Sequence, residues 1–333
     1  MQNLKETNLS FLPITEPFLH EFYEKQKNSL WFTYELMSEI ETDKEHFNNI
    51  SKTSPELKKL ITTILSFFAQ LDGLVSQNLG CNFIQDFGYI KAASNFFAAQ
   101  NFNEVIHNET YSFFIDNLIE NSKEKDTLFN SSLNFNYIHR ILSWIKTYTD
   151  ESVYTSHKRL VAFICLEGIL FNAGFVIINW IKINKGLYPA LTKANEWILK
   201  DETLHMNFGI ALFNHVKAIE NVSFSDFRNI VEECIVSSIN FIKECLPNPM
   251  FDLSQDNIIK YLEYVANYIS INCGYGELLY EDITENPCTW MELVSLPNKV
   301  NFHERSNTDY SKPMKDNCVI NFNVLDENEE LWR

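Results

Sequence analysis

Glutamate and histidine stand three residues apart at two places in the chain, as Glu104 with His107 and as Glu202 with His205. Side chains three residues apart lie on the same face of an α-helix. On a helical wheel, each pair falls on a face that is otherwise apolar, whereas solvent-facing charges belong on the opposite face. Each pair is therefore predicted to present a carboxylate and an imidazole to the interior of the fold.

Two further carboxylates lie alone on apolar stripes, Asp72 in SFFAQLDGLV and Glu167 in FICLEGILF. They precede the two glutamate–histidine pairs by 32 and 35 residues, so one acid followed by an acid–histidine pair occurs twice. Each feature taken singly has an ordinary explanation, such as a solvated helix face or a helix break. Together they indicate a ligand, because four ionised carboxylates in an apolar core are prohibitive unless they are neutralised.

A pair of divalent cations would balance four carboxylates, and the imidazoles would complete the coordination. Carboxylate-rich sites with some imidazole suit iron or manganese better than zinc or copper. One acid from each of two helices, with a Glu-x-x-His motif from each of two others, is the ligand arrangement of ferritin-like dimetal bundles. The pattern therefore predicts an all-α, ferritin-like helical bundle with a central four-helix dimetal site.

Helical patterns recur where such a bundle requires them. Apolar residues follow helical spacing from about residue 55 to residue 285, and no stretch shows sustained strand alternation. Gly and Pro number only 9 each in 333 residues, which suits long helices. The predicted helices cover about residues 53–79, 87–120, 134–149, 158–184, 192–219, 224–245 and 254–285. We expect one mainly α-helical domain over residues 1–295, in which residues 1–30 form an N-terminal extension.

Composition and charge exclude several classes of function. The 44 acidic residues outnumber the 27 basic ones, giving a net charge of −17, whereas phosphate binding needs clustered Lys and Arg. A nucleic-acid partner is therefore not expected. The seven cysteines form no CxxC pair and no zinc spacing, which is typical of free thiols in a reducing compartment. The N-terminal residues show no secretory pattern, so the expected location is the cytoplasm.

One apolar segment, residues 161–181, has a single charge in 21 residues and is long enough to cross a membrane. Glu167 lies near its middle, where a charge costs about 2.5–3.5 kcal/mol on insertion scales. The alternative is a central bundle helix that is buried on all sides. If Glu167 binds a metal ion, its helix belongs at the centre of a soluble bundle.

The last part of the chain, residues 296–333, is polar with few periodic apolar positions, which is typical of a mobile tail. Its final residues, FNVLDENEELWR, regain apolar side chains among acids. Such a tip could dock into a groove on another chain, or it could be a frayed terminus. Composition alone leaves both readings open.

Four stretches carry a resemblance to a known family: FFAQLDGLVSQNL, NEVIHNETYSFFIDNLI, RLVAFICLEGILFNAGF and NEWILKDETLH. They resemble the small, radical-generating subunit of class I ribonucleotide reductase, and the resemblance extends from about Trp31 to the C-terminus. It implies two metal sites, one formed by Asp72, Glu104 and His107 and the other by Glu167, Glu202 and His205. The implied cofactor is two iron ions, oxo-bridged when oxidised, with manganese as an alternative.

The resemblance also implies a role for the tyrosine that lies one helical turn after His107. Tyr111 matches the family's radical tyrosine, and an apolar pocket that protects the radical is implied at Phe171, Phe175 and Ile198. A route for radical transfer, beginning at the metal ligand His107, is implied through Asp201, Trp31 and Tyr310. The implied reaction oxidises the tyrosine with dioxygen and passes the radical to a large subunit, which reduces ribonucleotides to deoxyribonucleotides. The implied partners are this large subunit, docked by the C-terminal tail, and a second small subunit.

Two departures from the family pattern leave other readings open. Lys200 stands beside Asp201 where we expect arginine, and lysine lacks the planar fork of arginine. The segment between Trp31 and Asp72 is somewhat longer than usual. One alternative is a regulatory or weakly active paralogous small subunit, and another is a stand-alone dimetal oxidase or iron-storage protein. Aspartate as the first ligand and a tyrosine at position 111 argue against desaturases, hydroxylases and ferritins.

Overall fold

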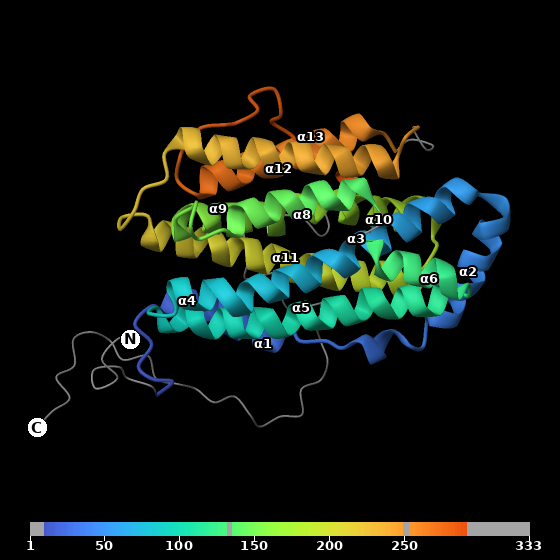
Figure 1. Ribbon diagram of the computed structural model, residues 1–333, viewed down its shortest axis with the longest axis horizontal. Coiled ribbons are helices and arrows are strands. Elements are labelled where there is room, and N and C mark those ends of the chain that lie inside the picture. Colours follow the sequence, from blue (N-terminus) through green and yellow to red (C-terminus); the bar gives the residue numbers. More distant parts are fainter. Residues whose placement is uncertain (1–9, 132–134, 249–252, 292–333) are drawn as a thin grey trace, which may run out of the picture.

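The computed structural model describes residues 10–131, 135–248 and 253–291. Its elements are helices that run mostly side by side (Figure 1). The long helices are α3 (Pro55–Asn78), α5 (Lys91–Leu118), α11 (Pro189–Val216), α12 (Phe224–Cys245) and α13 (Gln255–Asn272). The shorter helices are α1 (Pro17–Asn28), α2 (Ile40–Thr53), α4 (Ile84–Phe87), α6 (Ser122–Phe129), α8 (Asn136–Thr149), α9 (Ser156–Cys165) and α10 (Asn172–Lys185). Single turns are η1 (Thr33–Leu36) and η4 (Thr289–Met291), which are 3-10 helices, and η2 (Leu79–Phe83) and η3 (Leu166–Leu170), which are π-helices.

The helices stack in layers, and the predicted ligands lie in the middle of the stack. Helices α12 and α13 form one outer layer, α8 to α11 lie beneath them, and α3, α5 and α1 lie on the opposite side (Figure 1). Helix α3 packs along α5, and α11 packs against both α9 and α10. Asp72 lies on α3, Glu104 on α5, Glu167 on η3 and Glu202 on α11. The predicted all-α, ferritin-like bundle is therefore confirmed.

The segment predicted as one apolar helix over residues 158–184 is a helix interrupted by a π-turn. Helix α9 ends at Cys165, η3 follows, and the Phe171 N–H donates to the Leu166 carbonyl at 3.3 Å, five residues back. Such π-turns occur mostly as single turns inside α-helices, frequently at functional sites. This one includes Glu167. The extra residue in the turn therefore sets the direction in which this carboxylate points.

Two helical segments are long and apolar enough to cross a membrane on length and composition alone. They are Pro55–Asn78 and Ser156–Lys185, and their most apolar stretches are 72% and 100% buried inside the fold. Core helices of soluble proteins pass the same test. Burial of the whole apolar stretch of the second segment is what its interpretation as a central bundle helix predicts.

Helix α11 begins where a side chain from another helix caps it. Two residues just before the helix, Gly186 and Tyr188, have left-handed backbone conformations, with φ of 60° and 58°. The buried Asp43 of α2 accepts the Ala190 N–H at 3.0 Å and the Leu191 N–H at 2.8 Å. A carboxylate at this position satisfies free amide groups and interacts favourably with the helix dipole. Asp43 thereby fixes the start of the helix that supplies two ligands.

The two ends of the described chain depart from the sequence-based expectation. Helix α13 ends at Asn272 rather than near residue 285, because Gly274 and Gly276 adopt φ of 85° and 72°, outside the helical region. At the other end, α1 lies inside the segment expected to be an extension and packs against α5 and α11. Residues 292–333, which include the predicted tail and Tyr310, lie outside the described residues.

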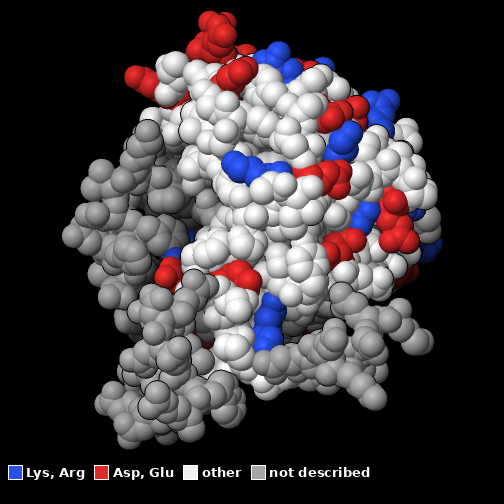
Figure 2. All heavy atoms as spheres, turned by 90° about the vertical axis from the view of Figure 1, so that its left-hand side faces the viewer, with Lys and Arg blue, Asp and Glu red and all other residues white. Residues whose placement is uncertain are grey.

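Charged side chains are dispersed on the face shown in Figure 2, where lysines and arginines lie singly among acidic and uncharged residues. Elsewhere on the described surface, charged side chains form ion pairs between elements, such as Lys193 with Glu39 at 2.9 Å and Lys58 with Glu124 at 2.9 Å. Exposed pairs of this kind contribute little to stability. The stability of the fold depends instead on its continuous apolar core, within which the candidate site lies.

Candidate metal centre

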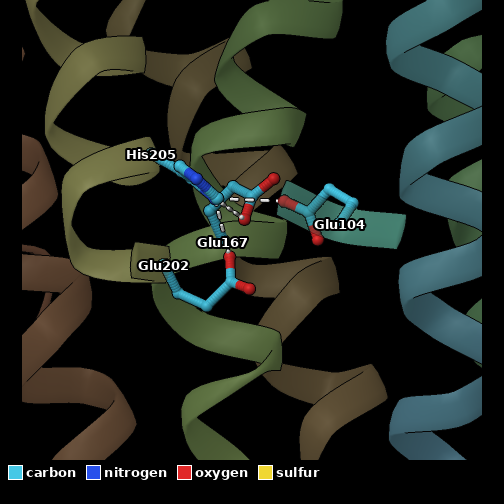
Figure 3. Close-up of side chains that lie close together, drawn as sticks. All are labelled: Glu104, Glu167, Glu202 and His205. Atoms are coloured by element: carbon cyan, nitrogen blue, oxygen red, sulfur yellow. Dashed lines mark hydrogen bonds and ion pairs between the residues drawn. The ribbon is translucent and has the colours of Figure 1, made fainter. Parts of the chain in front are cut away.

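Four predicted ligands from three elements converge at the centre of the bundle. Glu104 approaches from α5, Glu167 from η3, and Glu202 and His205 from α11 (Figure 3). Each of the four residues offers one ligand atom, and these four atoms all lie within 4.8 Å of one another. All four side chains are buried. His205 Nδ1 lies 3.0 Å from Glu104 Oε1 and 3.2 Å from Glu202 Oε2. The glutamate–histidine pairs on separate helices thus meet in one cluster.

The other two predicted ligands adjoin this cluster. His107 Nδ1 lies 3.0 Å from Glu202 Oε1 and 3.4 Å from Glu104 Oε2. Asp72 is 1% exposed, and its carboxyl interacts electrostatically with both histidines and with Glu104 and Glu202. The structure therefore brings five of the six predicted ligands into contact and places the buried Asp72 within electrostatic range of them.

Several buried ligand atoms have no hydrogen-bond partner among the described residues. They are Asp72 Oδ1 and Oδ2 and Glu167 Oε2, whereas Glu104 Oε2, Glu202 Oε1 and His107 Nδ1 have only their close contacts with one another. Buried polar atoms of this kind are costly unless something satisfies them. Carboxylate oxygens and imidazole nitrogens with free lone pairs are suitable ligands for iron or manganese. The donor set therefore fits a pair of metal ions, and this fit is independent of the sequence motif.

The outer nitrogen of each histidine is held by a second layer of polar groups. His107 Nε2 lies 3.3 Å from Asp201 Oδ2, and His205 Nε2 lies 2.8 Å from Gln26 Oε1. Since Asp201 and Gln26 are acceptors, each Nε2 is assigned the proton, which leaves Nδ1 as the ligand atom. This assignment requires the Asn103 amide, whose nitrogen is placed 3.1 Å from His107 Nε2, to turn its oxygen toward the ring instead. Gln26 also donates to Asp201 Oδ1 at 3.4 Å. Gln26 therefore connects the second layers of the two histidines.

Two glutamines of the site are not among the predicted residues. Gln100 Nε2 donates to Glu167 Oε1 at 3.1 Å. It lies one turn before Glu104 on the same inward stripe, so the helical wheel contained the signal for it. Gln26 lies in the short helix α1, more than 170 residues from its partners. No local pattern distinguishes it in the sequence.

Burial and neighbouring charges shift the pKa values of the ligands in different directions. Burial raises the pKa of Asp72 well above its usual range, and His107 opposes this shift. Burial and the Glu202 carboxylate raise the pKa of Glu167. For Glu202, burial acts in the same direction, but hydrogen bonds with Glu167 and the histidines outweigh it and lower its pKa. Burial favours neutral imidazoles, but carboxylate partners outweigh it and raise the pKa of His107 and His205.

Metal binding is therefore expected to release protons. Because the pKa values of Asp72 and Glu167 are raised, these carboxyls hold protons to higher pH than ordinary carboxyls do, and a cation must displace those protons. The affinity for ferrous iron should rise as the pH rises. Calorimetric titration in two buffers of different ionisation enthalpy measures the protons released. Equal heats in both buffers, with an affinity that does not change with pH, would contradict this expectation.

Tyr111 lies fully buried beside the ligands and is enclosed by aromatic rings. Its ring stacks on Phe68 with centroids 4.5 Å apart, and Phe68 in turn stacks on Phe175 at 4.8 Å. The Tyr111 hydroxyl has no hydrogen-bond partner among the described residues. Burial raises the pKa of this phenol well above its usual range, and the Asp72 carboxylate raises it further. The phenol is therefore protonated at any ordinary pH.

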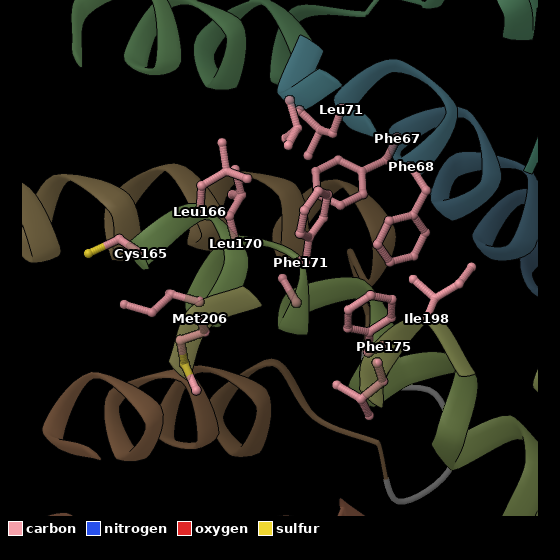
Figure 4. Packing of buried hydrophobic residues seen from close by; sticks show 14 of the residues in the cluster. Phe67, Phe68, Leu71, Cys165, Leu166, Leu170, Phe171, Phe175, Ile198 and Met206 are labelled. Atoms are coloured by element: carbon pink, nitrogen blue, oxygen red, sulfur yellow. The ribbon is translucent and has the colours of Figure 1, made fainter. Parts of the chain in front are cut away.

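The side chains predicted to form an apolar pocket lie near one another, together with Phe68, which was not among the predicted residues. Phe171 lies 6.0 Å from Phe68 between ring centroids, and Ile198 of α11 lies near Phe175 (Figure 4). All of these side chains are 1% exposed or less. Phe68 lies one turn before the ligand Asp72, which was the available signal for it.

Gly174 gives the Phe68 ring its space, so substitution there is expected to disturb this packing. A Cβ at position 174 would lie 2.6 Å from Phe68 Cζ, and the ring is confined by Tyr111 and Phe175. Gly174→Ala should lower the free energy of unfolding by about 1–3 kcal/mol. Gly73→Ala is the control, because its Cβ would meet only Asn108 Nδ2 at 3.4 Å. Denaturant unfolding of the two variants gives the comparison, and equal stabilities would contradict the packing argument.

Trp31 lies beside Asp201 and His107 in the described structure. The residue is 3% exposed, its Nε1 donates to Asp201 Oδ2 at 2.8 Å, and its ring stacks on His107 with centroids 5.8 Å apart. Trp31, Asp201 and His107 therefore form one connected group. Lys200 is partly exposed beside Asp201 on α11. Tyr310 lies outside the described residues.

Comparison with known proteins shows sequence relatives over most of the chain. The family "Ribonucleotide reductase, small chain" matches residues 8–287. The ribonucleoside-diphosphate reductase small chain of Yaba-like disease virus is 35% identical over 300 residues, covering 90% of this chain and 89% of that protein. Ribonucleoside-diphosphate reductase subunit M2 of Homo sapiens is 31% identical over 300 residues, covering 90% and 74%.

Solved structures of low sequence identity share the fold. The ribonucleotide reductase R2 subunit from Clostridium botulinum has a TM-score of 0.73 at 21% identity and covers 84% of this chain and 88% of that one. The Rnr4 homodimer from Saccharomyces cerevisiae gives 0.70 at 23%, covering 84% and 85%. An R2-like ligand-binding oxidase with an Mn/Fe cofactor gives 0.64 at 17%, covering 76% and 92%. Together with the buried carboxylate and histidine cluster, the family match places this chain in the ribonucleotide reductase small-chain family, as an oxidoreductase subunit.

Proposed function

We propose that this small chain generates a radical on Tyr111 and supplies it to a large subunit that reduces ribonucleotides to deoxyribonucleotides. The observation that carries the proposal is the environment of Tyr111. The phenol is fully buried beside the carboxylate cluster, its ring is stacked on Phe68, and its hydroxyl has no partner among the described residues. A tyrosine that served only packing would normally have its hydroxyl satisfied.

The six side chains of the cluster would hold two iron ions, with manganese as the alternative. When bound, these ions react with dioxygen and provide the oxidising power for the tyrosine. Because burial and Asp72 keep the Tyr111 phenol protonated, its oxidation removes one electron and one proton, and the product is a neutral radical. Bound metal ions would supply the oxidising power for loss of the electron, and a carboxylate of the cluster would accept the proton. Loss of the proton avoids leaving a positive charge in the apolar pocket.

The pocket around Tyr111 would protect this radical. Phe68, Phe171, Phe175 and Ile198 are buried and keep water and dissolved reductants away from the ring. Transfer out of the pocket would use the connected group of His107, Asp201 and Trp31, in which Asp201 accepts a hydrogen bond from the N–H of each neighbour. From Trp31 the route would continue to Tyr310 and the large subunit, to which the C-terminal tail would dock.

The proposal includes the assembly and the location of the protein. One solved relative of this fold is a homodimer, and we propose the same assembly for this chain. The cysteines at 165, 234, 245, 273 and 288 are free and buried. Free thiols suit a reducing compartment, and we propose the cytoplasm.

Two other functions have observations in their favour. The likeness to an R2-like ligand-binding oxidase favours a stand-alone dimetal oxidase. Lys200, in place of the expected arginine beside Asp201, favours a regulatory or weakly active paralogous small subunit. Neither alternative accounts for the contact of Trp31 with Asp201 and His107 as well as radical transfer does.

Deletion of residues 315–333 separates these functions. With the cognate large subunit, and with this chain as the sole radical source, we expect the full-length protein to support ribonucleotide reduction. The truncated protein should load metal and react with dioxygen as before but should no longer support reduction, because docking is lost. Reduction by the truncated protein at the full-length rate would contradict the proposal. An absence of reduction by the full-length protein would favour one of the alternatives.

A further inference from the structure

A second tryptophan contacts Trp31 on the side of the solvent. The Trp197 ring lies 5.2 Å from the Trp31 ring between centroids, at an interplanar angle of 47°. Trp31 is 3% exposed, whereas Trp197 is only partly buried. Trp31 also stacks on His107 at the metal centre. Two indole rings in contact therefore extend from a metal ligand to the protein surface.

One row of side chains on α11 also runs from the metal centre to the protein surface. Lys193, Trp197, Asp201 and His205 are spaced four residues apart, so they lie along one face of the helix. His205 and Asp201 are 0% and 1% exposed, while the Lys193 side chain is 36% exposed. Trp197 is thus the intermediate position between a buried ligand and a surface cation.

The charged groups beside the two indoles have opposite effects on the stability of the oxidised, positively charged ring. The Asp201 carboxylate accepts the Trp31 N–H at 2.8 Å and stabilises an oxidised, positively charged Trp31. The Lys193 ammonium lies 5.2 Å from the centroid of the Trp197 ring and makes oxidation of that ring harder. Glu39 pairs with Lys193 at 2.9 Å and reduces its effect. An electron vacancy is therefore more stable on Trp31 than on Trp197.

We propose that Trp197 is a redox-active residue that carries the oxidising equivalent between Trp31 and the protein surface. Trp197 gives one electron to oxidised Trp31, which becomes neutral, and Trp197 becomes the radical cation. A phenol presented at the surface then gives one electron to Trp197 and its proton to water, and the phenol becomes a neutral radical. The inference rests on the proposed radical transfer through Trp31.

Photo-oxidation of the full chain without iron tests the electron exchange itself. A flash-excited ruthenium complex with a sacrificial acceptor is too bulky to reach the buried Trp31 but can oxidise Trp197. Peptide mapping by mass spectrometry then measures oxygen incorporation at both residues. In the unsubstituted protein, oxidation at Trp31 is expected. In Trp197→Phe, which keeps an aromatic ring that is hard to oxidise, oxidation at Trp31 should fall about tenfold or more.

Three further variants distinguish redox exchange from packing. Trp197→Tyr restores an oxidisable ring and should recover oxidation at Trp31. Trp290→Phe is the matched control, because this other partly buried indole donates to the Val176 carbonyl and should not affect Trp31. Lys193→Gln should raise oxidation at Trp197 relative to Trp31. Equal oxidation at Trp31 in the unsubstituted protein and Trp197→Phe would overturn the proposal.

The iron-loaded protein shows whether the exchange serves turnover. Trp197→Phe should form the Tyr111 radical in the same yield as the unsubstituted protein but support ribonucleotide reduction at least about tenfold more slowly. Loss of the radical in Trp197→Phe would indicate a structural role and would overturn the proposal. If the unsubstituted protein forms no Tyr111 radical, the proposed function fails, whereas the photo-oxidation result still decides the role of Trp197.

Discussion

Replacement of Tyr111 by phenylalanine is expected to abolish ribonucleotide reduction while leaving the fold and the metal content unchanged. The tyrosine is 0% exposed and its hydroxyl has no partner among the described residues, so removing one oxygen breaks no observed hydrogen bond. The Phe68 stack can accommodate a phenylalanine ring. Activity with the large subunit should fall at least about a thousandfold, which corresponds to about 4 kcal/mol.

Tyr261→Phe is the matched control for this substitution. Tyr261 is 1% exposed and lies on α13, where its hydroxyl reaches Asn172 Oδ1 at 3.5 Å. Its loss should leave reduction near the unsubstituted rate. Metal analysis, circular dichroism and the reductase assay, run on both variants, separate loss of the radical from loss of structure. Substantial reduction by Tyr111→Phe would show that another residue stores the oxidising equivalent.

Removal of His205 is expected to have the largest effect on metal binding. Its Nδ1 lies within 3.2 Å of carboxylate oxygens from two helices, and its Nε2 is held by Gln26 at 2.8 Å. His205→Ala removes one ligand, together with the N–H that donates to Gln26 Oε1. The affinity of the metal site that contains His205 should therefore fall by more than about 100-fold. The variant should bind at most one iron ion per chain and form no tyrosyl radical.

The exposed His215, ten residues further along α11, provides the control for this variant. His215→Ala should bind two iron ions per chain, as the unsubstituted protein does. Iron content after gel filtration, measured by a chromogenic chelator, distinguishes the two variants. Two tightly bound ions in His205→Ala would contradict its assignment as a ligand.

The ligand set was predictable because its spacing and its burial cost both appear in the sequence. Glu104 with His107, and Glu202 with His205, follow helical spacing, and inward carboxylates need a counter-charge whatever the tertiary structure. Local pattern was therefore sufficient to identify the helices that bind the metal ions. Prediction of Tyr111 rested on resemblance, because a buried tyrosine has no distinctive spacing.

Features that depend on contacts distant in sequence were not predictable. Gln26 reaches His205 across 179 positions, and Phe68 meets the Tyr111 ring only after α3 packs on α5. The π-turn at Leu166–Leu170 was also missed, since one extra residue per turn hardly changes an apolar stretch that is buried all round. Trp197 is likewise an ordinary helical residue until Trp31 is placed beside it.

Electron paramagnetic resonance of the iron-loaded, oxygen-exposed protein tests the central claim most directly. The protein is prepared with ordinary and with ring-deuterated tyrosine, and the Tyr111→Phe variant is prepared in parallel. We expect a tyrosyl signal whose hyperfine structure narrows on deuteration and which is missing from the variant. A fully loaded dimetal centre that reacts with dioxygen but gives no tyrosyl signal, or a signal that persists in Tyr111→Phe, would contradict the assignment of Tyr111 as the radical site.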